Sequence, residues 1–179
     1  MQVADRNRSH RTIMVLAVVC AVLELALAPN VALGLGRINF ALVFAGCMAL
    51  SLGGRTGVIS GFAAGLFFDL CTTGPIGLMA LLCTVSAYLL GAEVRNKIAT
   101  EPGHTVVEFA IATVIVSLLY HLMMLVMGDG SSIFDALFLR TVPTALLTVI
   151  AYLPFMLVLS RRDGGGSSLG GAHSAKRLR

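Results

Sequence analysis

The chain has 179 residues, of which 57% are hydrophobic and 12% are charged, and its formal net charge is +4. Soluble domains carry about 25% charged residues, so this composition excludes an ordinary soluble domain and indicates a single integral membrane domain. Apart from Arg140, the basic residues lie outside the apolar stretches, a layout that indicates membrane orientation and not nucleic-acid binding.

Six apolar stretches predict six transmembrane helices. A spanning helix needs roughly 20 apolar residues, whereas a membrane β-barrel needs alternating polarity, and here the apolar runs are continuous. The stretches lie at residues 12–28, 38–53, 57–70, 74–91, 105–127 and 133–159. We therefore expect an all-α membrane domain over residues 12–160. A polar segment (1–11) precedes it, and a basic Gly/Ser-rich tail (161–179), which cannot bury a core, follows it.

The first stretch has one alternative interpretation. A basic segment precedes it and it ends in Ala26-Leu27-Ala28, as a cleaved signal peptide would. Pro29 directly after the expected cleavage point, and the further apolar stretches, favour an uncleaved first helix instead.

The third stretch is short for a span at about 1.5 Å per residue. It either extends back through Gly53 and Gly54 or lies obliquely inside the protein. In the sixth stretch we expect Pro143 and Pro154 to bend the helix.

A ridge of glycines runs along the third stretch. Gly57, Gly61, Gly65 and Asp69 recur every four residues, which places them on one face of a helix. Small residues at this spacing let membrane helices approach closely. We expect the three glycines to pack against other helices and Asp69 to point into protein.

The charge distribution predicts the topology. With six helices both termini lie on one side, and of the 13 Lys and Arg residues only Arg37 falls on the opposite side, while Arg140 lies within a helix. The remaining eleven lie on the side of the termini. This asymmetry places both termini in the cytoplasm.

Four ionisable residues fall at a similar depth in this topology. Glu24, Asp69, His121 and Arg140 all lie in the outer half of their helices. A lone charge at the bilayer centre costs at least about 2.5–3.5 kcal/mol, so these groups indicate mutual pairing or a polar cavity that opens outward.

We hypothesise that Arg140 pairs with Asp69 or Glu24, with Thr144 and Thr148 continuing a polar stripe four residues apart. Three interpretations stay open at this point. The pair could only hold helices together, the cluster could form a partner or ligand site, or Glu24 and Arg140 could snorkel to the interface.

No pattern in the sequence indicates catalysis. The four cysteines lack metal-ligand spacing, and there is no nucleophile–base set, phosphate loop or HExxH motif. We expect no enzyme activity, no metal and no cofactor.

The segment from residue 57 to residue 91 carries a family resemblance. It reads "GVISGFAAGLFFDL", "CTTG", "PIG" and "LMALLCTVSAYLLG", a glycine-rich helix ending in Asp, a short turn, Pro-x-Gly and a second apolar helix. The last helix, "LRTVPTALLTVIAYLPF", is followed by Arg161-Arg162. These features resemble the bacterial rod shape-determining MreD family over most of residues 12–162. One departure is Ile38-Asn39 before the second helix, where the family has Pro-Asp.

The resemblance implies a non-enzymatic scaffold subunit of the cell elongation machinery in the bacterial inner membrane. Such a subunit binds the bitopic protein MreC and works with RodA, a class B penicillin-binding protein and, indirectly, MreB. The family is similar in fold to the S subunits of energy-coupling-factor transporters, so a small-molecule-binding transporter subunit is the alternative. The likeness gives Asp69 and the turn with Thr72, Gly74, Pro75 and Gly77 a role at the rim where a partner docks.

Overall fold

The computed structural model describes residues 2–33, 36–96, 102–128 and 132–164. Its helices are α1 (Gln2–Ala26), α2 (Phe40–Ser51), α3 (Gly54–Cys71), α4 (Leu78–Asn96), α5 (Pro102–Val126) and α6 (Val142–Gly164). A π-helical segment, η1 (Asp135–Thr141), precedes α6, and strands β1 (Ala32–Leu33) and β2 (Gly36–Arg37) lie between α1 and α2. The prediction of an all-α fold is confirmed.

Two helical segments in the described part of the chain are long and apolar enough to cross a membrane, His104–Val126 and Leu137–Leu159. The apolar segments Phe40–Ser51 and Leu78–Glu93 are shorter. The 12 residues of α2 extend about 18 Å at 1.5 Å per residue, less than the roughly 30 Å of a hydrocarbon core. That all six helices cross the membrane stays a prediction.

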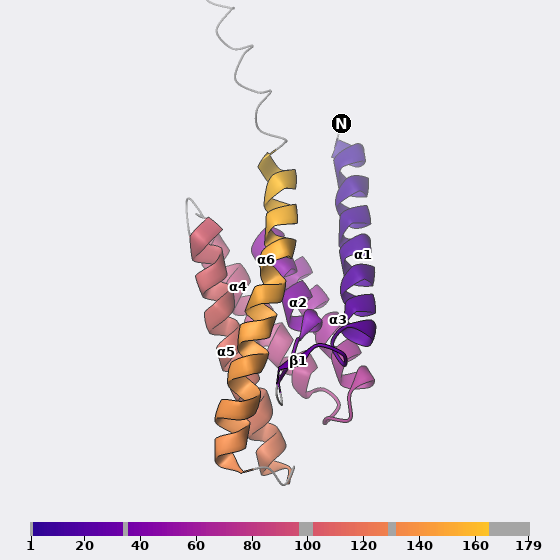
Figure 1. The fold of residues 1–179 in the computed structure, drawn as a ribbon. Helices are drawn as coiled ribbons and strands as arrows, with labels where there is room; N and C mark the ends of the chain where they lie inside the picture. The colour runs from indigo at the N-terminus through magenta and orange to yellow at the C-terminus, as the bar shows by residue number, and fades with distance from the viewer. Residues whose placement is uncertain (1, 34–35, 97–101, 129–131, 165–179) are drawn as a thin grey trace, which may run out of the picture.

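The helices form one bundle around α2. Figure 1 shows α6 along the length of the molecule and α1 beside its upper part, with the start of α1 and the end of α6 at the same end. Every residue of α2 from 40 to 49 is buried, as expected for a helix that is apolar all round. Phe109 of α5 stacks on Tyr152 of α6, with ring centroids 4.0 Å apart.

Two helices extend beyond the predicted stretches. α1 begins at Gln2 instead of residue 12, because no Gly or Pro interrupts the polar residues before the apolar stretch. It ends before Pro29, which cannot continue a helix. α6 continues to Gly164, so its last residues occupy the start of the expected tail, and residues 165–179 lie outside the described part.

The turn between α3 and α4 occupies the start of the predicted fourth stretch. α4 begins at Leu78, not at Gly74. Gly77 has φ +99°, a left-handed conformation that favours glycine and interrupts the helix. α3 begins at Gly54, in agreement with the extension back through the preceding glycines.

The β-hairpin and the π-helical segment have no counterpart in the sequence analysis. β1 and β2 pair antiparallel, with Ala32 opposite Arg37. A Cβ on Gly36 would lie 2.7 Å from Pro143 Cγ, so β2 packs directly against the start of α6. Pro143 has no N–H to donate, and a π-helical segment at such a break widens the turn.

Candidate functional site: a polar cavity between capped helices

Asp69 closes the N-terminus of α4. Its Oδ2 accepts the backbone N–H groups of Gly77 at 2.9 Å and Ala80 at 3.0 Å, and its Oδ1 accepts that of Met79 at 3.1 Å. Only 1% of the residue is exposed. The first N–H groups of a helix have no partner within the helix and carry partial positive charge, which a carboxylate satisfies. The buried charge therefore has a structural explanation.

Glu24 accepts the first N–H groups of α2 in the same way. Its Oε2 accepts the N–H of Phe40 at 2.7 Å and that of Ala41 at 3.3 Å. Asn39 is the N-cap, and its Oδ1 accepts the N–H of Leu42 at 2.9 Å. The end of α1 is thereby attached to the start of α2.

The described partners of both carboxylates in the hypothesised pair with Arg140 are backbone groups. Both carboxylates accept backbone N–H groups of helix termini. Helix N-termini bind anions through such N–H groups, and the pairing of Arg140 with either carboxylate stays a prediction. Asp69 is also separate from the cavity described below, whereas Glu24 and Arg140 both line it.

The glycine ridge lies where α3 meets α2 and α4. Gly57, Gly61 and Gly65 are all buried. A Cβ on Gly57 would lie 3.0 Å from Ala49 Cα, one on Gly61 2.9 Å from Ala87 Cβ, and one on Gly65 2.5 Å from Ala80 Cα. The contacts at Gly57 and Gly65 involve backbone atoms of the neighbouring helix, so a side chain there has no space.

The turn between α3 and α4 is held on both sides. The Thr72 hydroxyl donates to Phe68 O at 3.0 Å, and Pro75 O accepts the N–H of Leu78 at 3.3 Å. A Cβ on Gly74 would lie 2.6 Å from the Tyr120 hydroxyl oxygen, which places the turn against α5. At its tip Ile76 is 75% exposed.

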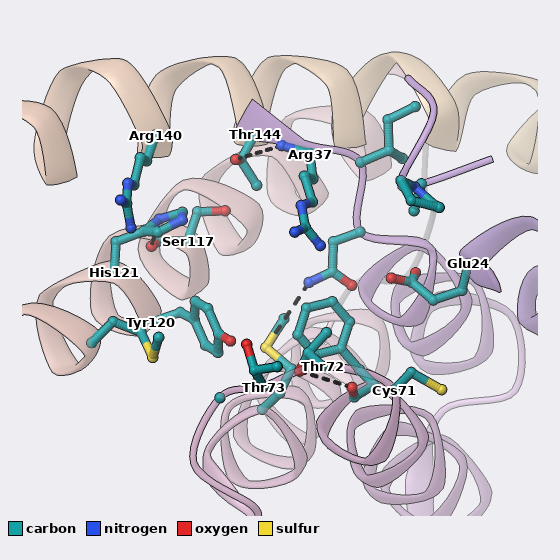
Figure 2. A pocket seen from close by; sticks show the side chains of 18 of the residues that line it. Glu24, Arg37, Cys71, Thr72, Thr73, Ser117, Tyr120, His121, Arg140 and Thr144 are labelled. Atoms are coloured by element: carbon teal, nitrogen blue, oxygen red, sulfur yellow. Dashed lines mark hydrogen bonds between the residues drawn. The ribbon is translucent and has the colours of Figure 1, made fainter. Parts of the chain in front are cut away.

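A cavity of about 540 Å³ lies between this turn, the end of α1, β2, α5, η1 and α6. Figure 2 shows Arg37, Arg140, Ser117 and Thr144 on one side of it and Tyr120, Thr72, Thr73 and Cys71 on the other. Apolar side chains complete the wall, among them those of Leu25, Ile38, Phe68, Met79 and Met124. The cavity combines charged, hydroxyl and apolar groups.

Threonines of α6 fix one wall of the cavity. Thr144 Oγ1 accepts the N–H of Arg37 at 3.2 Å, and Thr148 Oγ1 accepts that of Asn39 at 3.2 Å. Both threonines are buried. These bonds hold β2 and the start of α2 against α6, so the polar stripe on α6 has a structural role.

His121 connects α5 to η1. Its Nδ1 lies 2.8 Å from Ser117 O and 3.2 Å from Thr141 Oγ1. The ring of Tyr120 packs edge-on against both His121 and Phe68. His121 lines the cavity, and its contacts with Ser117 and Thr141 hold its ring in place.

The cavity wall brings together five of the predicted residues: Glu24, Thr72, Gly74, His121 and Arg140. Sequence reasoning missed Arg37, Asn39 and Tyr120. Asn39 directly precedes an apolar run, which is a helix-start signal, whereas nothing local in the sequence indicates that Arg37 and Tyr120 line one cavity.

Within the described residues, no three His, Cys, Asp or Glu side chains gather in a geometry that could hold a metal. Cys20, Cys47 and Cys83 are buried free thiols, and Cys71 is an exposed one on the cavity wall. The cavity is suited to binding, and the hydrogen bonds around it hold the neighbouring helices in place.

Comparisons with known proteins give one match. A family model described as rod shape-determining protein MreD matches residues 7–161. Neither the curated proteins nor the solved structures contain a match to the chain.

Proposed function

Because the chain belongs to the rod shape-determining MreD family, we propose that it is a non-enzymatic scaffold subunit of the bacterial cell elongation machinery. In this proposal it spans the inner membrane with six helices and with both termini in the cytoplasm. It binds the bitopic protein MreC, and through that complex it helps to position peptidoglycan synthesis by RodA and a class B penicillin-binding protein. MreB filaments connect to it indirectly.

The observation that carries the proposal, besides the family, is the rigid turn between α3 and α4. Asp69 holds the turn and the first residues of α4 through three N–H groups. The tip of the turn exposes Ile76, which no part of the described chain covers. An exposed apolar side chain on a fixed backbone suits docking, since little conformational entropy is lost on binding.

A scaffold role also agrees with the chemistry of the chain. The buried carboxylates Asp69 and Glu24 serve helix termini, and the threonines of α6 hold neighbouring segments in place. These groups order a surface for a partner, and MreC is the partner that the family supports.

Co-purification tests the proposal. The tagged full chain is isolated from membranes in mild detergent, and MreC is quantified by mass spectrometry relative to a mock purification. We expect MreC to be strongly enriched. Lack of enrichment with a chain that restores rod shape to a depleted strain would refute MreC binding.

A matched pair of variants tests the docking surface. Ile76→Ser changes the tip of the turn, and Ile133→Ser changes an isoleucine of similar exposure, 67% against 75%, at the start of the last helical segment. We expect MreC recovery to fall several-fold only for Ile76→Ser. Equal recovery for both variants would remove the turn from the docking surface.

A further inference from the structure

Among the described residues that line the cavity, cationic side chains outnumber anionic ones. Arg37 and Arg140 contribute two guanidinium groups, while Glu24 contributes the only carboxylate among the described lining residues. That carboxylate already accepts two N–H groups at the start of α2, where the helix carries partial positive charge. Among the described lining residues, two guanidinium groups therefore stand against one carboxylate, and Arg37 lies near enough to Glu24 to attract it electrostatically.

Asp69, at the N-terminus of α4, contributes no carboxylate to the cavity wall. Asp69 is buried in its bonds to α4 and does not line the cavity wall. The remaining polar groups are hydroxyls, among them those of Ser117 and Tyr120, together with the Asn39 amide, the His121 imidazole and the Cys71 thiol. Hydroxyl and guanidinium groups are donors suited to carboxylate and phosphate oxygens.

The size and the apolar lining of the cavity suit a ligand larger than a simple ion. The volume of about 540 Å³ falls in the range of roughly 300–1,000 Å³ that is usual for small-molecule sites. Phe68 and Tyr120, in edge-on contact with centroids 5.9 Å apart, form an aromatic wall, and Met79 and Met124 also line the cavity. An apolar body would fit beside the charged groups.

We infer that this cavity binds a small organic anion, a carboxylate or phosphate attached to an apolar group, with Arg37 and Arg140 facing the charge. The inference goes beyond the scaffold role and does not depend on MreC. A soluble metabolite and a lipid headgroup could both supply this chemistry, and the experiment separates them.

Cys71 is a built-in reporter for the cavity. It lines the wall and is exposed, while Cys20, Cys47 and Cys83 are 4%, 2% and 0% exposed. Reaction of the purified full chain with anionic and cationic methanethiosulfonates of similar size therefore reports the local potential. Each rate is divided by the rate of the same reagent with a free thiol.

The Glu24 carboxylate also acts electrostatically on the Cys71 thiol, so the informative quantity is the change in the anionic-to-cationic rate ratio when the arginines are removed. A cleft of one sign concentrates counter-ions, so the double variant Arg37→Gln/Arg140→Gln should lower the normalised ratio several-fold, while Arg55→Gln, which changes an exposed arginine away from the cavity, should leave it unchanged. Added salt should shrink the difference between the unmodified protein and the double variant. A ratio that the double variant leaves unchanged, or a difference that is insensitive to salt, would overturn the inference.

Protection of Cys71 tests binding itself. Butyl phosphate should slow the reaction several-fold, and butyltrimethylammonium, its cationic counterpart, should not. Equal protection by both probes, or by neither, would overturn the inference. Protection in phosphatidylglycerol nanodiscs but not in phosphatidylcholine nanodiscs, without added probe, would assign the anion to lipid, whereas protection only by the soluble probe would assign it to a free molecule.

Discussion

The close contact between α3 and α4 at Gly65 gives the sharpest stability prediction. A Cβ added at this position would lie 2.5 Å from both Ala80 Cα and Met79 O, whereas ordinary contact begins at 3.4 Å. These are backbone atoms of α4, so no side-chain rotation relieves the clash. For Gly65→Ala the two helices must separate by about 0.9 Å, and overpacking of this kind costs about 1–3 kcal/mol.

The three glycines of the ridge provide a series of alanine variants with graded clashes. The nearest atom to an added Cβ is 2.5 Å away at Gly65, 2.9 Å at Gly61 and 3.0 Å at Gly57. At Gly61 that nearest atom is the Cβ of Ala87. We therefore expect Gly65→Ala to be the most destabilising of the three alanine variants. Ala63→Leu is the control, because this residue of α3 is exposed.

The buried cysteines make the measurement possible. The chain has no Trp, so intrinsic tryptophan fluorescence is not usable. A thiol-reactive fluorogenic dye in a Cys71→Ser background reports the exposure of the three buried cysteines during heating. At about 2–4 °C per kcal/mol for a chain of this size, a cost of about 1–3 kcal/mol for Gly65→Ala should lower Tm by roughly 2–12 °C. An unchanged Tm for Gly65→Ala, or a larger fall for Ala63→Leu, would refute the packing argument.

Three further outcomes follow from the hydrogen bonds. Asp69→Ala leaves three N–H groups without their acceptor and should lower the free energy of unfolding by about 3 kcal/mol. Asp69→Asn keeps one acceptor oxygen and should lower it by about half as much. The dye assay distinguishes the two variants by their Tm. The double exchange Asp69→Arg/Arg140→Asp should melt no higher than Asp69→Arg alone, and recovery of Tm would show that the two side chains pair after all. Asn39→Ala should lower stability by about 1 kcal/mol through loss of the N-cap, and Asn39→Asp should not, with equal Tm values for the two variants contradicting the cap.

The helices were predictable because apolar runs and Gly/Pro positions determine them locally. The order and approximate positions of all six follow from the sequence, and the errors lie at the ends. α1 starts earlier than expected because polar residues without Gly or Pro continue a helix that has already formed. α4 starts later because Gly77 adopts a left-handed conformation that only the three-dimensional turn requires.

The site was only partly predictable. The positions of Glu24, His121 and Arg140 along their helices predicted a similar depth in the membrane, and the three residues do line one cavity. Their partners depend on the hairpin between α1 and α2, which has two residues in each strand and leaves no periodic signal. Glu24 therefore reaches Phe40 through a turn that the sequence analysis did not contain, and charge matching alone favoured Arg140 as its partner.

The central claim is that the turn between α3 and α4 contacts MreC in the cell. A photo-crosslinking amino acid at Ile76, with the same residue at Ile133 as the control, tests it in living cells whose rod shape depends on the modified chain. We predict an adduct with MreC from Ile76 and little or none from Ile133. Rod-shaped cells without an MreC adduct from Ile76 would contradict the account.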